Sequence, residues 1–89
     1  LSKSNANALI EGNGPFLGYG PIEASILYAF GDMLLLVQND FPDSHVWLLA
    51  DVFKKTHKRL PGALSLEEIL LLPNLHPAAL LAIRGDPSP

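Results

Sequence analysis

Three histidines are the side chains of this sequence that are best suited to hold a metal. His45, His57 and His76 are, besides the carboxylates, its possible transition-metal ligands. His45 and His57 fall on different turns of one predicted helix, outside the i, i+4 spacing with which two histidines bind zinc. His76 precedes Pro77, which places it at the start of a predicted helix. The sequence therefore predicts neither a metal site nor a cofactor.

A basic cluster is the second group with possible binding chemistry. It holds four of the six Lys and Arg residues, Lys54, Lys55, Lys58 and Arg59, and could bind phosphate, an anionic surface or an acidic partner. Cations in a last helical turn also offset the negative end of the helix dipole, and we favour this explanation. The net charge of −3 and the lack of interleaved aromatic residues argue against nucleic-acid binding.

The serines, acids and glycines match no catalytic pattern. Ser44 and Ser65 are expected at helix starts, and no GxSxG sequence is present. Glu67 and Glu68 complement the positive end of a helix. The four glycines between residues 12 and 20 miss the dinucleotide-binding spacing by one residue, and no GK[ST] sequence follows. We predict that the chain is not an enzyme.

Length and composition predict one small packed domain. The 89 residues are 48% hydrophobic and 17% charged, and none is a cysteine that could form a disulfide. The longest apolar region, 24–37, is broken by Gly31 and Asp32 and is too short for a transmembrane helix.

The element that organises the chain is a helix predicted within residues 40–60, with its body at 42–59. Asp40 or Asp43 would cap its first turn, Pro42 suits that turn, and a Pro-Gly pair stops the helix. Its apolar face is too wide to be covered on one side only. The candidates for contact with a partner are Val46, Trp47, Leu48, Val52 and Phe53.

The remaining elements flank this helix. Residues 22–30 fit either a helix or a strand, and the apolar run 33–37 predicts a strand buried on both faces. Ser65 with Glu68 forms a capping box that opens a short helix, and Pro77 begins a last helix that stops at Gly85.

These elements predict an α+β domain over residues 8–85. We expect residues 1–7 to form a disordered tail, residues 8–11 to form a short strand and residues 86–89 to form a Pro-rich tail. Three helices follow the strand at 33–37, and 22–30 would pair with that strand as a hairpin. A mostly helical domain is the alternative, and the whole unit could also belong to a larger lobe.

Several short motifs resemble, in order, the C-terminal end of TAXI-type solute-binding proteins, the extracytoplasmic receptors of TRAP transporters. The similarity covers a little over half of the chain. The matching segments are the strand 33–37, Asp40-Phe41-Pro42-Asp43 followed by Trp47, Ser65-Leu66-Glu67, and Leu75-His76-Pro77-Ala78-Ala79.

This resemblance implies an extracytoplasmic, periplasmic setting and a carboxylate-type solute for the whole receptor. A complete receptor is several times longer than this chain, so no binding residue is carried over, and the partner would be the remainder of the receptor. The alternative function is a small interaction module that binds another protein through the apolar face of helix 42–59.

Overall fold

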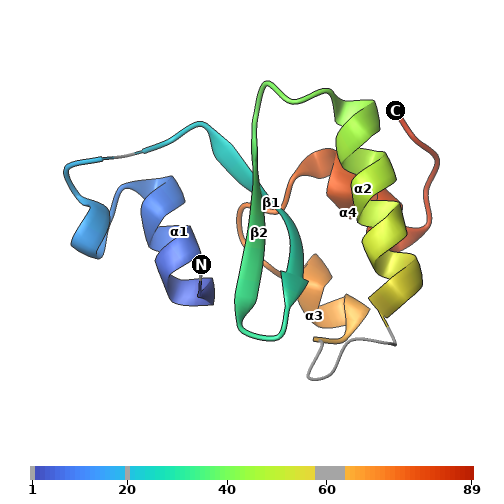
Figure 1. Ribbon diagram of the computed structural model, residues 1–89, viewed down its shortest axis with the longest axis horizontal. Helices are drawn as coiled ribbons and strands as arrows, with labels where there is room; N and C mark the ends of the chain where they lie inside the picture. The colour runs from blue at the N-terminus through green and yellow to red at the C-terminus, as the bar shows by residue number, and fades with distance from the viewer. Residues whose placement is uncertain (1, 20, 58–63) are drawn as a thin grey trace.

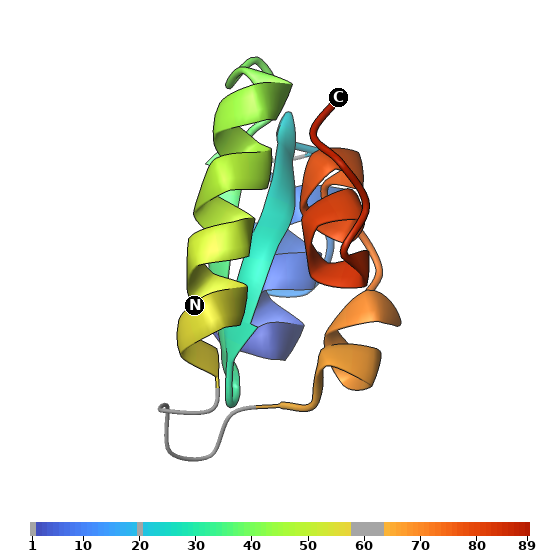
Figure 2. The same ribbon diagram turned by 90° about the vertical axis from the view of Figure 1, so that its right-hand side faces the viewer.

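A two-stranded antiparallel sheet lies between helices in the computed structural model, which describes residues 2–19, 21–57 and 64–89 (Figures 1 and 2). The elements are α1 (Lys3–Glu11), the 3-10 helix η1 (Gly14–Phe16), β1 (Ala24–Phe30), β2 (Met33–Gln38), α2 (Asp43–Thr56), α3 (Leu66–Leu70) and α4 (Pro77–Arg84). The predicted α+β class is confirmed, with helices predominating.

The ambiguous segment 22–30 forms a strand, not a helix. β1 pairs with β2 through a two-residue turn, and Gly31 adopts the positive φ of 58° that this tight turn needs. The outer edge of β1 is also covered. The amide of Ile26 donates to the Asn74 carbonyl and its own carbonyl accepts from the His76 amide, both at 2.8 Å. The hairpin prediction is therefore confirmed.

The prediction that residues 33–37 are buried on both faces is wrong. Leu34 is buried, but Met33 and Leu35 are exposed. The reason is that β2 lies at the side of a sheet of only two strands, so the helices that cover β1 do not cover all of β2. The apolar run 33–37 therefore leaves the side chains of Met33 and Leu35 in solvent.

A helix replaces the predicted N-terminal tail and the short strand at 8–11. Ser2 caps α1 by accepting from the Asn5 amide, and Gly12 ends it in the left-handed conformation. Ala6 and Ile10, one turn apart, are buried beside the sheet. This i, i+4 apolar pair anchors a segment of low helix propensity, and the described residues contain four α-helices where three were expected.

The three later helices begin near their predicted positions. Pro42, and not Asp40 or Asp43, takes the N-cap position of α2, so Asp43 is the first helical residue. Ser65 and Glu68 form the predicted capping box of α3. α4 begins at Pro77 and ends at Gly85. The predicted end of the long helix at Leu60 lies outside the described residues.

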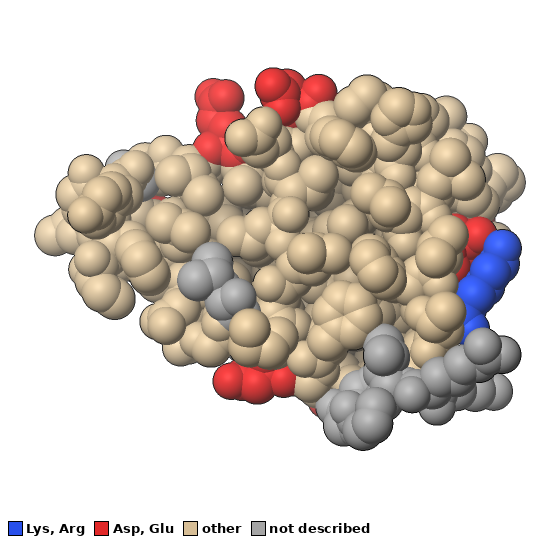
Figure 3. Space-filling view, in the orientation of Figure 1, with Lys and Arg blue, Asp and Glu red and all other residues tan. Residues whose placement is uncertain are grey.

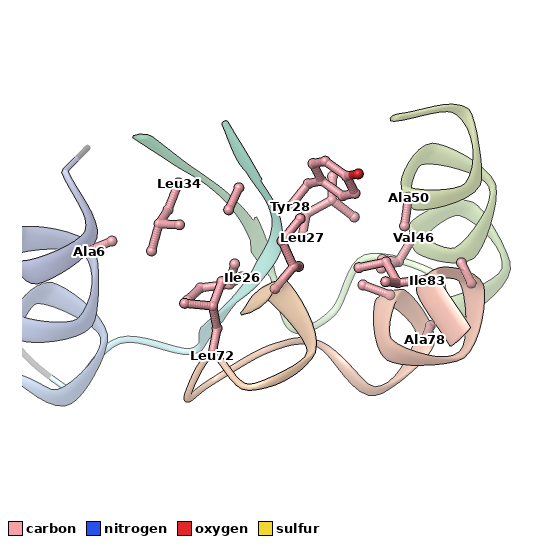
Figure 4. Close-up of a cluster of buried hydrophobic side chains, with 14 of the residues drawn as sticks. Ala6, Ile26, Leu27, Tyr28, Leu34, Val46, Ala50, Leu72, Ala78 and Ile83 are labelled. Carbon is pink, nitrogen blue, oxygen red and sulfur yellow. The ribbon is translucent and has the colours of Figure 1, made fainter. Parts of the chain in front are cut away.

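The core fills the space on both sides of the hairpin. α1 lies on one side, and α2 and α4 pack together on the other (Figure 2). Leu34 points toward Ala6 on α1, whereas Leu27 and Tyr28 point toward α2 and α4 (Figure 4). Consecutive residues of a regular strand point to opposite sides. Leu27 and Tyr28 can face the same helices because the strand register shifts between Ile26 and Tyr28.

Candidate functional site

α2 has a buried side and an exposed apolar side. Val46 and Ala50 are fully buried against the sheet and α4. On the other side Leu48 is 54% exposed, Leu49 40% and Val52 54%. Because 3.6 residues make one turn, these three side chains form one continuous strip along the helix. A helix of a small domain normally leaves such a strip polar.

Two residues of β2 extend this strip across the sheet. Leu35 pairs with Tyr28 and Met33 pairs with Phe30, and the rings of Tyr28 and Phe30 contact Phe53 of α2. Paired residues of an antiparallel ladder project to the same side, so Met33 and Leu35 lie on the side of the sheet that α2 covers. We call the exposed set the apolar face: Met33, Leu35, Phe41, Leu48, Leu49 and Val52.

Among the described residues, charges lie around this surface and not within it. Figure 1 and Figure 2 together place β2 and α2 on the side of the molecule that Figure 3 shows, and the centre of that view is uncharged. Acidic side chains appear at its upper and lower margins, and a pair of opposite charges at its right margin. An uncharged centre with charges at its rim fits the anatomy of a protein–protein interface, whose core is depleted of charged residues.

A cluster of aromatic rings supports the apolar face from beneath. The Tyr28 and Phe53 ring centroids are 5.7 Å apart, and the Phe30 and Phe53 rings meet edge to face at 5.2 Å. The Tyr28 hydroxyl lies 2.8 Å from Nδ1 of His57, and burial raises the pKa of this phenol above 10.0. The phenol therefore remains a neutral hydrogen-bonding group, and the base of the face is fixed by packing.

The five predicted partner-contact residues are divided between core and surface. Leu48 and Val52 belong to the apolar face. Val46 is completely buried, so no partner can reach it. Phe53 packs in the aromatic cluster. Trp47 is half-buried and donates from Nε1 to the Asp86 carbonyl at 2.9 Å, which ties it to the C-terminal segment.

The described part of the basic cluster is engaged within the chain. Lys55 lies 2.8 Å from the Asp51 carboxylate one turn earlier, and Lys54 donates to the Ala82 carbonyl in the last turn of α4 at 3.4 Å. Lys55 thus pairs within α2, and Lys54 contacts the carbonyl end of α4 instead of the end of its own helix. Lys58 and Arg59 lie outside the described residues.

The histidines are distributed over the molecule. His45 lies beside Phe41 on the exposed side of α2, with ring centroids 5.8 Å apart, and His57 belongs to the aromatic cluster. Within residues 2–19, 21–57 and 64–89, no three His, Asp or Glu side chains come close enough to hold a metal ion.

His76 lies at the start of α4, next to a carboxylate of α2. It is buried, its Nδ1 accepts from the Ala78 amide at 3.0 Å, and its Nε2 lies 3.7 Å from an oxygen of Asp43. Because Nδ1 is an acceptor here, the proton of the neutral ring is on Nε2 and points toward the carboxylate. Nδ1 thus caps α4, while Nε2 lies near Asp43 at a distance too long for a hydrogen bond.

One open pocket lies at the end of the hairpin far from its turn. It has a volume of about 440 Å³ and is lined by Ile22, Glu23, Ala24, Gln38 and Asp40. Two carboxylates in its wall would repel a carboxylate solute. The pocket therefore does not suit an anionic carboxylate ligand.

Sequence reasoning missed four members of the apolar face. The sequence predicts Met33 and Leu35 to lie in a buried strand, does not include Leu49 among the candidates for partner contact, and gives Phe41 only as part of a motif. A usable signal is present within α2: His45, Leu48 and Val52 follow intervals of three and four residues. Such alternation is typical of a seam between two helices.

No protein-family model matches this sequence, and the searches of curated proteins and of solved structures gave no match either. The resemblance to TAXI-type receptors therefore stays a prediction. Across the described ranges, none of the helices has the length and hydropathy needed to cross a bilayer.

Proposed function

We propose that this chain is a non-catalytic protein–protein interaction module that binds its partner through the apolar face. The observation that supports this function is the set of six exposed apolar side chains on β2, on α2 and on the segment that joins them. Exposing contiguous apolar surface costs about 25 cal/mol per Å², and monomeric proteins rarely keep large patches of it. A partner that covers the face removes this cost.

A photo-crosslinker tests this proposal directly. Benzoyl-phenylalanine replaces Leu48 at the centre of the apolar face and, as the matched control, Leu71, an 84% exposed leucine that follows α3. The protein is irradiated in the cells that produce it. We expect a discrete protein adduct from position 48 and none from position 71. Equal labelling from the two positions, or none from either, would contradict the proposal.

A second proposal is that the chain is a piece or a relative of a TAXI-type receptor lobe. It is supported by the order β2, α2, α3 and α4, which follows the order of the matching motifs. In that case the remainder of the receptor would cover the apolar face, and the chain would be periplasmic. The coding sequence upstream of Leu1 tests this proposal. A contiguous lobe with a secretory signal would support it, and an in-frame stop directly before the chain would exclude it.

A further inference from the structure

The apolar face is complementary to itself, and we propose that it binds a second copy of this chain, with the two α2 helices antiparallel. This inference rests on the proposed function, because it names the partner of the same surface. Two features of α2 support it: the spacing of its exposed side chains and the distribution of charge along its length.

The exposed seam of α2 can lie on a two-fold axis. Its members within α2, His45, Leu48 and Val52, are spaced by three and four residues as the contact residues of paired helices are, and Phe41 precedes the helix. Leu48 and Leu49 lie at the middle of the helix. An axis between them places Leu48 of one copy against Leu49 of the other, and His45 against Val52. Such an interface is closed and uses the same residues in both copies.

The charges of α2 favour the antiparallel arrangement. Asp40 is exposed just before the helix, whereas Asp43 in its first turn lies beside His76, on the side of α2 that faces α4. The Lys55 side chain in the last turn is 73% exposed, next to Asp51 with which it pairs. Antiparallel pairing brings the acidic end of each helix to the basic end of the other, and it also opposes the helix dipoles. Parallel pairing would place like charges together.

The extent of α2 and β2 limits the area that a dimer can bury. A standard interface buries about 800 Å² per partner, which is about 15% of the 5363 Å² surface of this chain. α2 has 14 residues and so a length of about 21 Å, and β2 widens the apolar face beside it. The apolar face would be the centre of such an interface, with the residues around it completing the buried area.

Disulfide trapping tests the orientation. Since the chain has no cysteine, each introduced thiol is unique. His45→Cys and Val52→Cys proteins are mixed and oxidised gently, and the crosslinked peptides are identified by mass spectrometry. We expect the mixed 45–52 bridge to exceed the 45–45 and 52–52 bridges at least about fivefold, because only facing pairs meet the distance limit of a disulfide. A majority of 45–45 and 52–52 bridges, or no crosslink, would overturn the antiparallel dimer.

Sedimentation equilibrium tests the surface. We expect the wild-type chain to form a dimer of twice its 9.6 kDa mass as its concentration rises. Leu48→Glu should raise the dissociation constant about a hundredfold or more, because it buries a charge near the axis in both copies. Leu71→Glu should leave the constant unchanged. Circular dichroism of both variants shows whether the fold is retained.

The outcomes separate this inference from the proposed function. A wild-type chain that stays monomeric at every concentration, with a different protein crosslinked from position 48, overturns the second copy but leaves the interaction module. The absence of a specific adduct at position 48 overturns both. A dimer that Leu48→Glu does not weaken shows that another surface is used, and also overturns the inference.

Discussion

The indole nitrogen of Trp47 donates a hydrogen bond to the backbone carbonyl of Asp86, 2.9 Å away and 39 residues further along the chain. This bond fastens the C-terminal segment to the side of α2 that faces α4 (Figure 1). Trp47 therefore joins two parts of the domain to each other. The surface open to a partner lies on another side of the same helix.

Substitutions at Trp47 should separate its hydrogen bond from its packing. Trp47→Phe keeps most of the ring contact and removes the donor, so we expect the free energy of unfolding to fall by about 1 kcal/mol. Trp47→Ala should cost about 3–5 kcal/mol. Urea denaturation followed by circular dichroism measures both. Equal losses would show that the hydrogen bond, and not the packing, dominates.

Tyr28 should make the domain sensitive to alkali. Its folded pKa is raised by burial above the ordinary 10.0, so the folded state holds the phenolic proton more tightly than the unfolded state does. The resulting stability is present below pH 10 and is lost as the pH rises through the folded pKa. Tyr28→Phe should remove this alkaline loss and cost about 1 kcal/mol at neutral pH. Tyr19→Phe, at an exposed position, is the control and should change neither quantity.

The stability of α4 should depend on the capping hydrogen bond of His76, and a smaller capping side chain should restore part of it. His76→Ala removes the acceptor for the Ala78 amide and a buried ring, so we expect a loss of about 2 kcal/mol or more. His76→Asn keeps a capping oxygen and should recover about 1 kcal/mol of that loss. Thermal unfolding measures the difference. If both variants lose the same stability, the capping bond contributes nothing.

Gly85 and Gly18 form a matched pair for backbone strain. Gly85 has a φ of 86°, and a methyl group there would lie 3.6 Å from Lys54 Nζ, an ordinary contact. The cost of Gly85→Ala is therefore conformational, about 1 kcal/mol. At Gly18 the added methyl group meets open space and φ is not positive, so Gly18→Ala should be neutral or slightly stabilising. Chemical denaturation of the two variants checks this contrast.

The elements that sequence predicted correctly are those specified by neighbouring residues. The capping box of Ser65 and Glu68 and the stop at Gly85 each act within one turn, and the structure has both. α1 was missed because Ser and Asn have low helix propensity, and its stability comes from Ala6 and Ile10 packing against the sheet.

The apolar face could be predicted only in part, because it too depends on packing between elements that are distant in the sequence. Whether Leu35 is covered depends on where α2 lies across the hairpin, and this is fixed by contacts such as those of Phe53 with Tyr28 and Phe30. A strand of continuous apolar residues carries no local signal of which side will stay open. Val46 and Val52 show the same limit, since they are equally apolar and only packing distinguishes them.

These two valines provide the last prediction, because they differ in environment and not in type. Val46 is fully buried and Val52 is 54% exposed on the same helix. Val46→Ala should lower the free energy of unfolding by about 2–3 kcal/mol through lost burial and a cavity. Val52→Ala should change it by no more than about 0.5 kcal/mol. The measurement is made at low protein concentration, so that self-association adds nothing to stability. At high concentration Val52→Ala should weaken association and Val46→Ala should not. The reverse pattern would place Val52 in the core and remove it from the apolar face.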